Sequence, residues 1–73
     1  MTLTELKYIT AVARTKHFGQ AAQACFVSQP TLSVAIRKLE EELSVTLFER
    51  NRTDVTITPI GELVIEQARR VLE

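Results

Sequence analysis

The stretch from Val27 to Leu43 constrains the fold of this chain most, because its residues specify both the start and the orientation of one helix. Ser28 stands where an N-cap residue belongs, and Pro30 falls in the first turn, where a missing N–H costs nothing. Apolar residues then recur at helical spacing in one narrow stripe: Leu32, Ile36, Leu39 and Leu43. The sequence therefore predicts a capped amphipathic helix that buries this stripe.

The opposite face of this helix is polar and carries few charges. Its residues are Pro30, Val34, Arg37 and Lys38, with Thr31 and Ser33 at the edges. The glutamates at positions 40 to 42 follow at the C-terminal end, where they oppose the helix dipole and would repel a phosphate backbone. If this helix meets DNA, it must enter by its N-terminal half, as the second helix of a helix-turn-helix does. The alternative is an ordinary solvated face.

The composition is that of one small globular domain, and the net charge does not by itself indicate a charged partner. The chain has 73 residues, 45% hydrophobic and 25% charged, and its apolar runs fall short of the roughly 20 residues that span a bilayer. Formal net charge is zero, which argues against a simple basic nucleic-acid binder, so the local placement of charge has to carry that hypothesis. The single cysteine, Cys25, suits a reducing cytoplasm and is expected to be a buried small hydrophobe.

Two helices are expected before the capped helix. Thr2 and Glu5 form a capping box that opens a helix from Leu3 to Arg14. A short helix over 18–25 is rich in alanine, so another helix can cross it closely. His17 lies between them without the companions of a metal site, and we expect it to hydrogen-bond locally. A short helix, a tight turn and a longer helix are the form of a helix-turn-helix.

A β-hairpin and a final helix are expected after residue 43. Residues 45–50 and 55–58 are β-branched and partly alternating, with a polar turn between them. Arg50 and Arg52 would project near the tip, toward phosphates or a minor groove, unless the hairpin is merely solvated. Thr58 and Pro59 then open a helix that Gly61 should weaken by about 1 kcal/mol relative to alanine. Its apolar stripe consists of Ile60, Leu63, Val64, Ala68, Val71 and Leu72.

This stripe still continues at Glu73, and no Gly or Asn closes the helix. We therefore expect a second copy to cover the stripe, and we expect the sequence to be part of a longer protein. The chain offers no Gly-rich phosphate loop, Cys/His cluster or Ser-His-Asp set, so it predicts neither an enzyme nor a cofactor or metal site.

Taken together, these segments resemble the N-terminal DNA-binding domain of LysR-type transcriptional regulators over the whole chain. The specific motifs are Ala21-Ala22, Val27–Ser33, Ile36–Glu40, Leu47–Arg50 and Thr58–Gly61. Within the family, His17-Phe18, Cys25 and Ser28–Ser33 are most similar to the peroxide-sensing OxyR group. The resemblance implies a mainly α fold: a winged helix-turn-helix over 1–58, with three helices and a two-stranded wing, and the start of a long linker helix over 59–73.

The resemblance also implies partners. Family members bind double-stranded DNA near promoters and dimerise through the linker helix, as dimers of dimers at full length, with an effector-sensing domain beyond residue 73. An activator in the bacterial cytoplasm, acting in the oxidative stress response, is the corresponding expectation, with RNA polymerase as a further candidate partner and no membrane. The alternatives are a LysR-type regulator that responds to a small metabolite and a winged-helix module that binds protein.

Family DNA contacts carried over by position fall on the recognition helix and the wing. They are Gln29, Pro30, Thr31, Ser33, Val34 and Arg37 in the helix, and Arg50, Arg52 and Thr53 in the wing. To these we add Ser28 and Lys38 of the same helix as expected DNA contacts. We expect Gln29, Thr31, Ser33 and Val34 to read base edges. We expect Lys38, Arg50 and Arg52 to neutralise phosphates, while Arg37 suits either a guanine or a phosphate.

Overall fold

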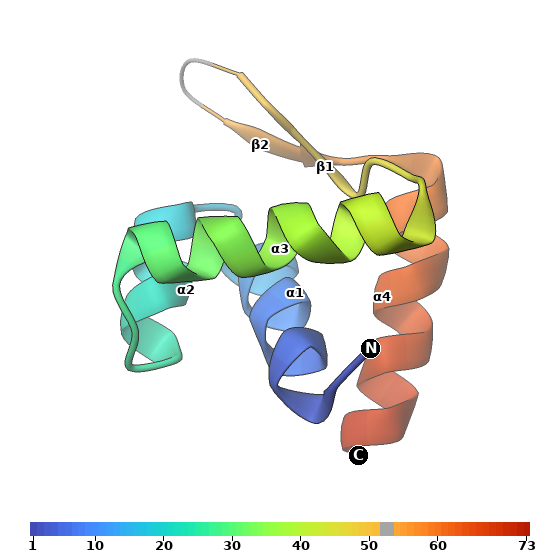
Figure 1. Ribbon diagram of the computed structural model, residues 1–73, viewed down its shortest axis with the longest axis horizontal. Coiled ribbons are helices and arrows are strands. Elements are labelled where there is room, and N and C mark those ends of the chain that lie inside the picture. Colours follow the sequence, from blue (N-terminus) through green and yellow to red (C-terminus); the bar gives the residue numbers. More distant parts are fainter. Residues whose placement is uncertain (52–53) are drawn as a thin grey trace.

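The computed structural model describes residues 1–51 and 54–73, and within them the chain forms a winged helix-turn-helix (Figure 1). The elements follow the order α1 (Leu3–Thr15), α2 (Phe18–Ala24), α3 (Gln29–Leu43), β1 (Phe48–Arg50), β2 (Val55–Ile57) and α4 (Pro59–Leu72). The mainly helical fold predicted from the sequence is confirmed. Helix α1 ends one residue later than predicted, and helix α2 ends one residue earlier.

Local side-chain caps start all the helices of the described residues. Thr2 and Glu5 close the predicted capping box, with hydrogen bonds of 3.1 Å from Glu5 N to Thr2 Oγ1 and 2.7 Å from Thr2 N to Glu5 Oε1. Ser28 and Thr58 cap α3 and α4, with side-chain oxygens that accept from Thr31 N and Gly61 N. His17 Nδ1 accepts a hydrogen bond of 3.0 Å from Gln20 N and caps α2, which confirms a local role for this histidine.

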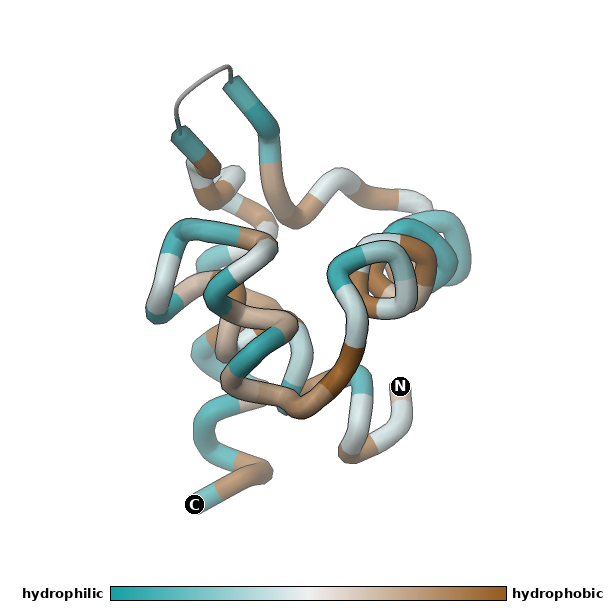
Figure 2. The backbone as a smooth tube through the Cα atoms, turned by 90° about the vertical axis from the view of Figure 1, so that its left-hand side faces the viewer, coloured by the Kyte–Doolittle hydropathy of each residue, from teal (hydrophilic) through white to brown (hydrophobic). Residues whose placement is uncertain are grey.

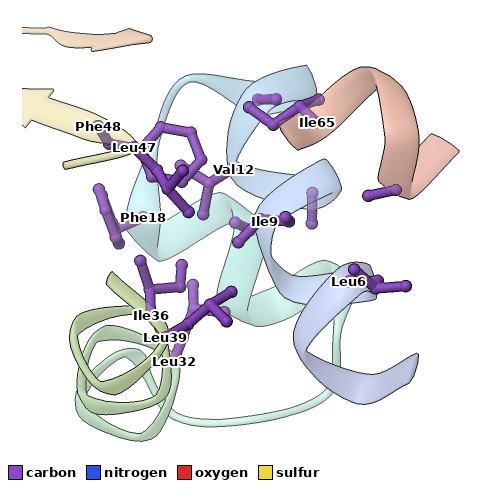
Figure 3. Packing of buried hydrophobic residues seen from close by; sticks show 14 of the residues in the cluster. Leu6, Ile9, Val12, Phe18, Leu32, Ile36, Leu39, Leu47, Phe48 and Ile65 are labelled. Atoms are coloured by element: carbon purple, nitrogen blue, oxygen red, sulfur yellow. The ribbon is translucent and has the colours of Figure 1, made fainter. Parts of the chain in front are cut away.

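Helix α1 is the centre of the domain and packs against α2, α3 and α4. Figure 3 shows the large apolar side chains of these helices meeting between α1, α3 and the start of β1. The fully buried ones are Ile9, Val12, Leu32, Leu39, Leu47 and Ile65. Cys25 was expected in this core but is only half-buried at its edge, so that prediction is wrong.

The hairpin is shorter than the sequence predicts. Strands β1 and β2 pair antiparallel, with Phe48 opposite Ile57 and Arg50 opposite Val55. Residues 45–47 are not a strand, because their backbone groups form hydrogen bonds with Glu40 and Thr58. Leu47 N donates to Glu40 Oε2 at 2.6 Å, and Leu47 O accepts from Thr58 N at 3.0 Å. The segment therefore anchors the hairpin between α3 and α4.

Helix α4 buries a different stripe from the predicted one. Gly61, Ile65 and Ala68 face the core, and a Cβ on Gly61 would overlap the Leu47 carbonyl oxygen. The propensity cost of Gly61 stays a prediction, and the structure adds that the close approach of α4 to Leu47 requires a glycine there. Ala68 is 1% exposed, so its prediction as part of a face for a second copy is corrected: it packs inside its own domain.

Both chain ends lie on the side of the domain away from the hairpin (Figures 1 and 2). Figure 2 shows polar and apolar residues mixed along each helix. Among the described residues, no helix has the length and apolar character needed to cross a membrane.

Candidate nucleic-acid interface

The N-terminal half of α3 presents an open polar face. Gln29, Pro30 and Thr31 are exposed, and Val34 keeps 52% of its surface in solvent. Arg37 and Lys38 are exposed as well, whereas Leu32, Ile36 and Leu39 of the same helix are buried. The predicted division of α3 into a core stripe and a solvent face is confirmed, and we call the exposed residues 29–31, 34, 37 and 38 the α3 face.

Ser28 and Thr31 hydrogen-bond to each other at the start of this helix. Ser28 Oγ accepts from Thr31 N at 3.2 Å, and the two hydroxyl oxygens lie 2.8 Å apart. Ser28 therefore has a structural task as the N-cap, beside any contact with DNA. Both residues remain exposed, so their hydroxyl groups are open to a ligand from the solvent side.

Gln29 reaches toward the start of α2. Its Oε1 would lie 3.4 Å from a Cβ placed on Gly19, and it lines one hollow with Lys16, Arg50 and Asn51. Lys16 is exposed and brings a cation to the border between α2 and the hairpin, but it was not among the predicted contacts. Its position directly before the first helix of a helix-turn-helix is the signal that could have identified it.

Arg50 folds back onto the domain instead of projecting from the hairpin. Its Nη2 donates a hydrogen bond of 2.8 Å to Ser33 Oγ, and its guanidinium carbon lies 3.5 Å from the centre of the Phe18 ring. The Phe18 ring in turn meets Phe48 edge to face, with centroids 6.2 Å apart. The prediction that Arg50 points out near the tip is therefore wrong, because a stacked and hydrogen-bonded position is available to it.

Ser33 is consequently not a free member of the α3 face. It is half-buried, and its hydroxyl oxygen is engaged by the hairpin. Its base-reading role stays a prediction, and the structure adds that its hydroxyl oxygen joins α3 to β1.

Charges on α3 are sorted along its length. Glu40 turns inward, and its Oε2 accepts from the backbone N–H groups of Leu47 and Phe48 at 2.6 and 3.3 Å. Glu41 and Glu42 stay exposed at the C-terminal end. The ion pairs found within residues 1–51 and 54–73 join Glu66 to Arg69 and to Arg70 on α4, and neither involves Arg37 or Lys38. The cations of α3 therefore remain open to an anionic partner.

The two remaining predicted wing contacts, Arg52 and Thr53, lie outside the described residues. Over the part of the chain that the structure describes, no group of three or more His, Cys, Asp or Glu side chains could hold a metal ion.

Comparison with known proteins identifies relatives over nearly the whole chain. Residues 3–62 match the family model described as bacterial regulatory helix-turn-helix protein, lysR family. The hydrogen peroxide-inducible genes activator of Pectobacterium carotovorum subsp. carotovorum is 53% identical over 72 residues, which cover 99% of this chain and 24% of that protein. The chain thus spans about a quarter of the length of the hydrogen peroxide-inducible genes activators that it matches.

Solved structures of regulators are similar to this chain as well. A full-length OxyR variant from Pseudomonas aeruginosa superposes with a TM-score of 0.93 at 57% identity, over 99% of this chain and 24% of that one. The DNA-binding domain of BenM, solved in complex with benA site 1 DNA, superposes with a TM-score of 0.93 at 39% identity, over 99% of this chain and 81% of that one.

Proposed function

Because the chain belongs to the lysR family of bacterial regulatory helix-turn-helix proteins, we propose that it is the DNA-binding domain of an OxyR-like transcription activator. The observation that carries this proposal is the α3 face: an exposed, capped helix start followed by Arg37 and Lys38, which form no ion pair with the described residues, in a fold shared with a domain solved on DNA. The relatives support a peroxide-responsive regulator. In this proposal it acts in the cytoplasm on chromosomal DNA, with RNA polymerase as a further partner. Family membership favours a regulator over an enzyme.

In this proposal α3 enters the major groove by its N-terminal half. Gln29 and Thr31 offer hydrogen-bonding groups to base edges, and Val34 offers an apolar surface to a thymine methyl group. Arg37 and Lys38 lie one turn further along, where they can reach a guanine or the phosphates. Few long side chains reach the bases, so DNA shape supplies part of the specificity.

A second copy of the chain is the proposed partner of α4. Three of its apolar residues keep large parts of their surface in solvent: Ile60 at 43%, Leu63 at 66% and Val71 at 59%. Half-buried Val64 and Leu72 border them. Residues 59–73 would then serve two purposes, since one face completes the domain core and the other joins two domains at the spacing of two half-sites.

Selection of bound duplexes from a random pool tests the proposal. We expect the purified protein to enrich an inverted repeat with half-sites about one or two helical turns apart. With roughly three phosphate-contacting cations per subunit, counted as Arg37, Lys38 and Arg52, the affinity of a dimer should fall with salt at a log–log slope of about −5. A protein that enriches no sequence and shifts no duplex at low salt would be a protein-interaction module instead.

The response to peroxide needs its own test, because a LysR-type regulator can respond to a small metabolite. Transcription from the selected site should rise on addition of hydrogen peroxide when the whole regulator is present. An unchanged level with peroxide, together with a response to a metabolite, would contradict the OxyR-like part of the proposal and leave DNA binding intact.

A further inference from the structure

We propose that Arg50 is a positioning residue: it holds the Ser33 hydroxyl as a hydrogen-bond donor toward one base pair, without contacting a base or a phosphate itself. The inference rests on the proposed function and deepens it. It assigns specificity at one base to a contact between the hairpin and the recognition helix, rather than to the recognition helix alone.

The geometry of this contact joins three elements of the domain. Arg50 comes from β1, Ser33 from α3, and the ring beneath the guanidinium is that of Phe18 in α2. Phe18 is only 7% exposed, and its edge-to-face contact with Phe48 limits how the ring can turn. Because the ring belongs to the core, it is a rigid platform that fixes the plane of the guanidinium and thereby the direction of its N–H groups.

The direction of the hydrogen bond between Arg50 and Ser33 follows from the chemistry of the groups. A guanidinium only donates, so the 2.8 Å bond fills a lone pair of Ser33 Oγ. A cationic donor also polarises the hydroxyl group and strengthens it as a donor in its own right. Within the described residues no group accepts the Ser33 hydroxyl hydrogen, so it is available to a ligand.

A hydroxyl held in this state discriminates between base edges. It can donate to N7 of a purine, O6 of guanine or O4 of thymine. Cytosine presents only its amino group in the major groove, which is itself a donor, and the nearby cation disfavours it. We therefore infer a preference at one position for an acceptor-bearing base edge, set by residues of both α3 and β1.

Arg50 is exposed and its guanidinium has further N–H groups, but the stacking on Phe18 and the bond to Ser33 hold that group against the domain. Swinging outward to a more distant phosphate would give up the stacking on Phe18 and the bond to Ser33 together, whereas Lys38 is exposed and makes no such contact with the residues that the structure describes. These two cations of the candidate interface should consequently behave differently toward DNA.

The test compares Arg50→Met with the matched variant Lys38→Met, using selection from a random duplex pool and salt titration of the purified protein. Methionine keeps much of the side-chain length and can still pack on Phe18, while it removes the charge and the hydrogen bond. We expect Arg50→Met to reduce the base preference at one position by about tenfold and to leave the log–log salt slope of affinity unchanged. We expect Lys38→Met to weaken all sequences alike and to reduce the slope by about one unit per subunit.

Coupling to Ser33 completes the test. Ser33→Ala should reduce the base preference at the same position as Arg50→Met does. The double variant should lose no more preference than either single variant, because both substitutions remove the same hydrogen bond. Uniform weakening by Arg50→Met with a smaller salt slope, or additive effects of the two substitutions, would overturn the inference and leave the proposed function standing. If the wild-type protein enriches no sequence, both the inference and the proposed function are contradicted.

Folding of the variants is checked by thermal melting, and Arg50→Lys provides a second variant. It keeps the charge but loses the planar group that stacks on the ring and reaches Ser33 at once, so it should relax the same position with an unchanged slope. If Arg50→Lys retains full specificity at that position, charge alone is sufficient and the positioning role is refuted.

Discussion

Helices α3 and α4 begin in the same way and end in different roles. Each opens with a hydroxyl cap and a proline in its first turn, Ser28 with Pro30 and Thr58 with Pro59, and each buries an apolar stripe. The exposed face of α3 is polar with scattered cations, while that of α4 carries Leu63 and other large apolar groups. The local signals that start a helix therefore say nothing about its partner, which depends on the face left in solvent.

The largest expected effect concerns the joint between α4 and the domain. Gly61→Ala places a methyl group against the Leu47 carbonyl, which also accepts from Thr58 N at 3.0 Å. Because backbone has to move to admit it, we expect a loss of about 3 kcal/mol in the free energy of unfolding, measured by urea denaturation.

The other glycine of the chain is the matched control. A Cβ on Gly19 meets chiefly the His17 ring, which caps α2 and would have to shift, but the better helix propensity of alanine offsets part of that cost, so Gly19→Ala should change stability by only about 1 kcal/mol. Equal effects of the two substitutions would show that α4 does not need its close approach to Leu47.

The second prediction separates the two faces of α4. Leu63 is 66% exposed, so Leu63→Lys should leave the melting of the folded monomer nearly unchanged. If a second copy covers this face, the same change should weaken self-association by about 2 kcal/mol, or about 30-fold, in analytical ultracentrifugation. Leu63→Met keeps an apolar group of similar volume and should preserve the dimer. Self-association that ignores Leu63→Lys would exclude this face as the interface.

The third prediction tests the α3 face as a reader of bases. Val34 is 52% exposed, so Val34→Ala removes two methyl groups from that face without opening the core. We expect a loss of about 1 kcal/mol in preference for thymine at one position, with an unchanged salt slope, measured by competition between duplexes that differ at one base pair. A loss shared equally by all competitors would place Val34 outside base recognition.

The helix starts could be predicted because they depend on residues three or four apart. The capping box of Thr2 and the caps at Ser28 and Thr58 need only their own neighbours. The stripe of α3 could be predicted for the same reason, since helical periodicity decides which residues share a face.

The corrected predictions involve contacts between residues far apart in the chain. Arg50 lies 17 residues from Ser33, and its stacking partner Phe18 is more distant still. Glu40 opposes the dipole of its own helix, yet its carboxylate binds the N–H groups that lead into β1. Gly61 is costly within α4 alone but is required by the carbonyl of Leu47. Propensity and spacing cannot reveal such roles, because each depends on how the elements pack.

The smallest expected effect lies at the C-terminal end of α3. Ser44 closes this helix in the left-handed conformation, with φ 56° and ψ 36°, and its N–H donates to the carbonyls of Glu40 and Glu41. Glycine adopts this conformation without the steric cost of a Cβ, so Ser44→Gly should raise the free energy of unfolding by about 0.7 kcal/mol in urea denaturation. Ser44→Ala keeps the Cβ and should bring no gain, which makes it the control. Equal free energies of unfolding for the two variants would mean that the left-handed conformation of Ser44 does not limit stability. The turn into the hairpin would then limit the stability of the C-terminal end of α3.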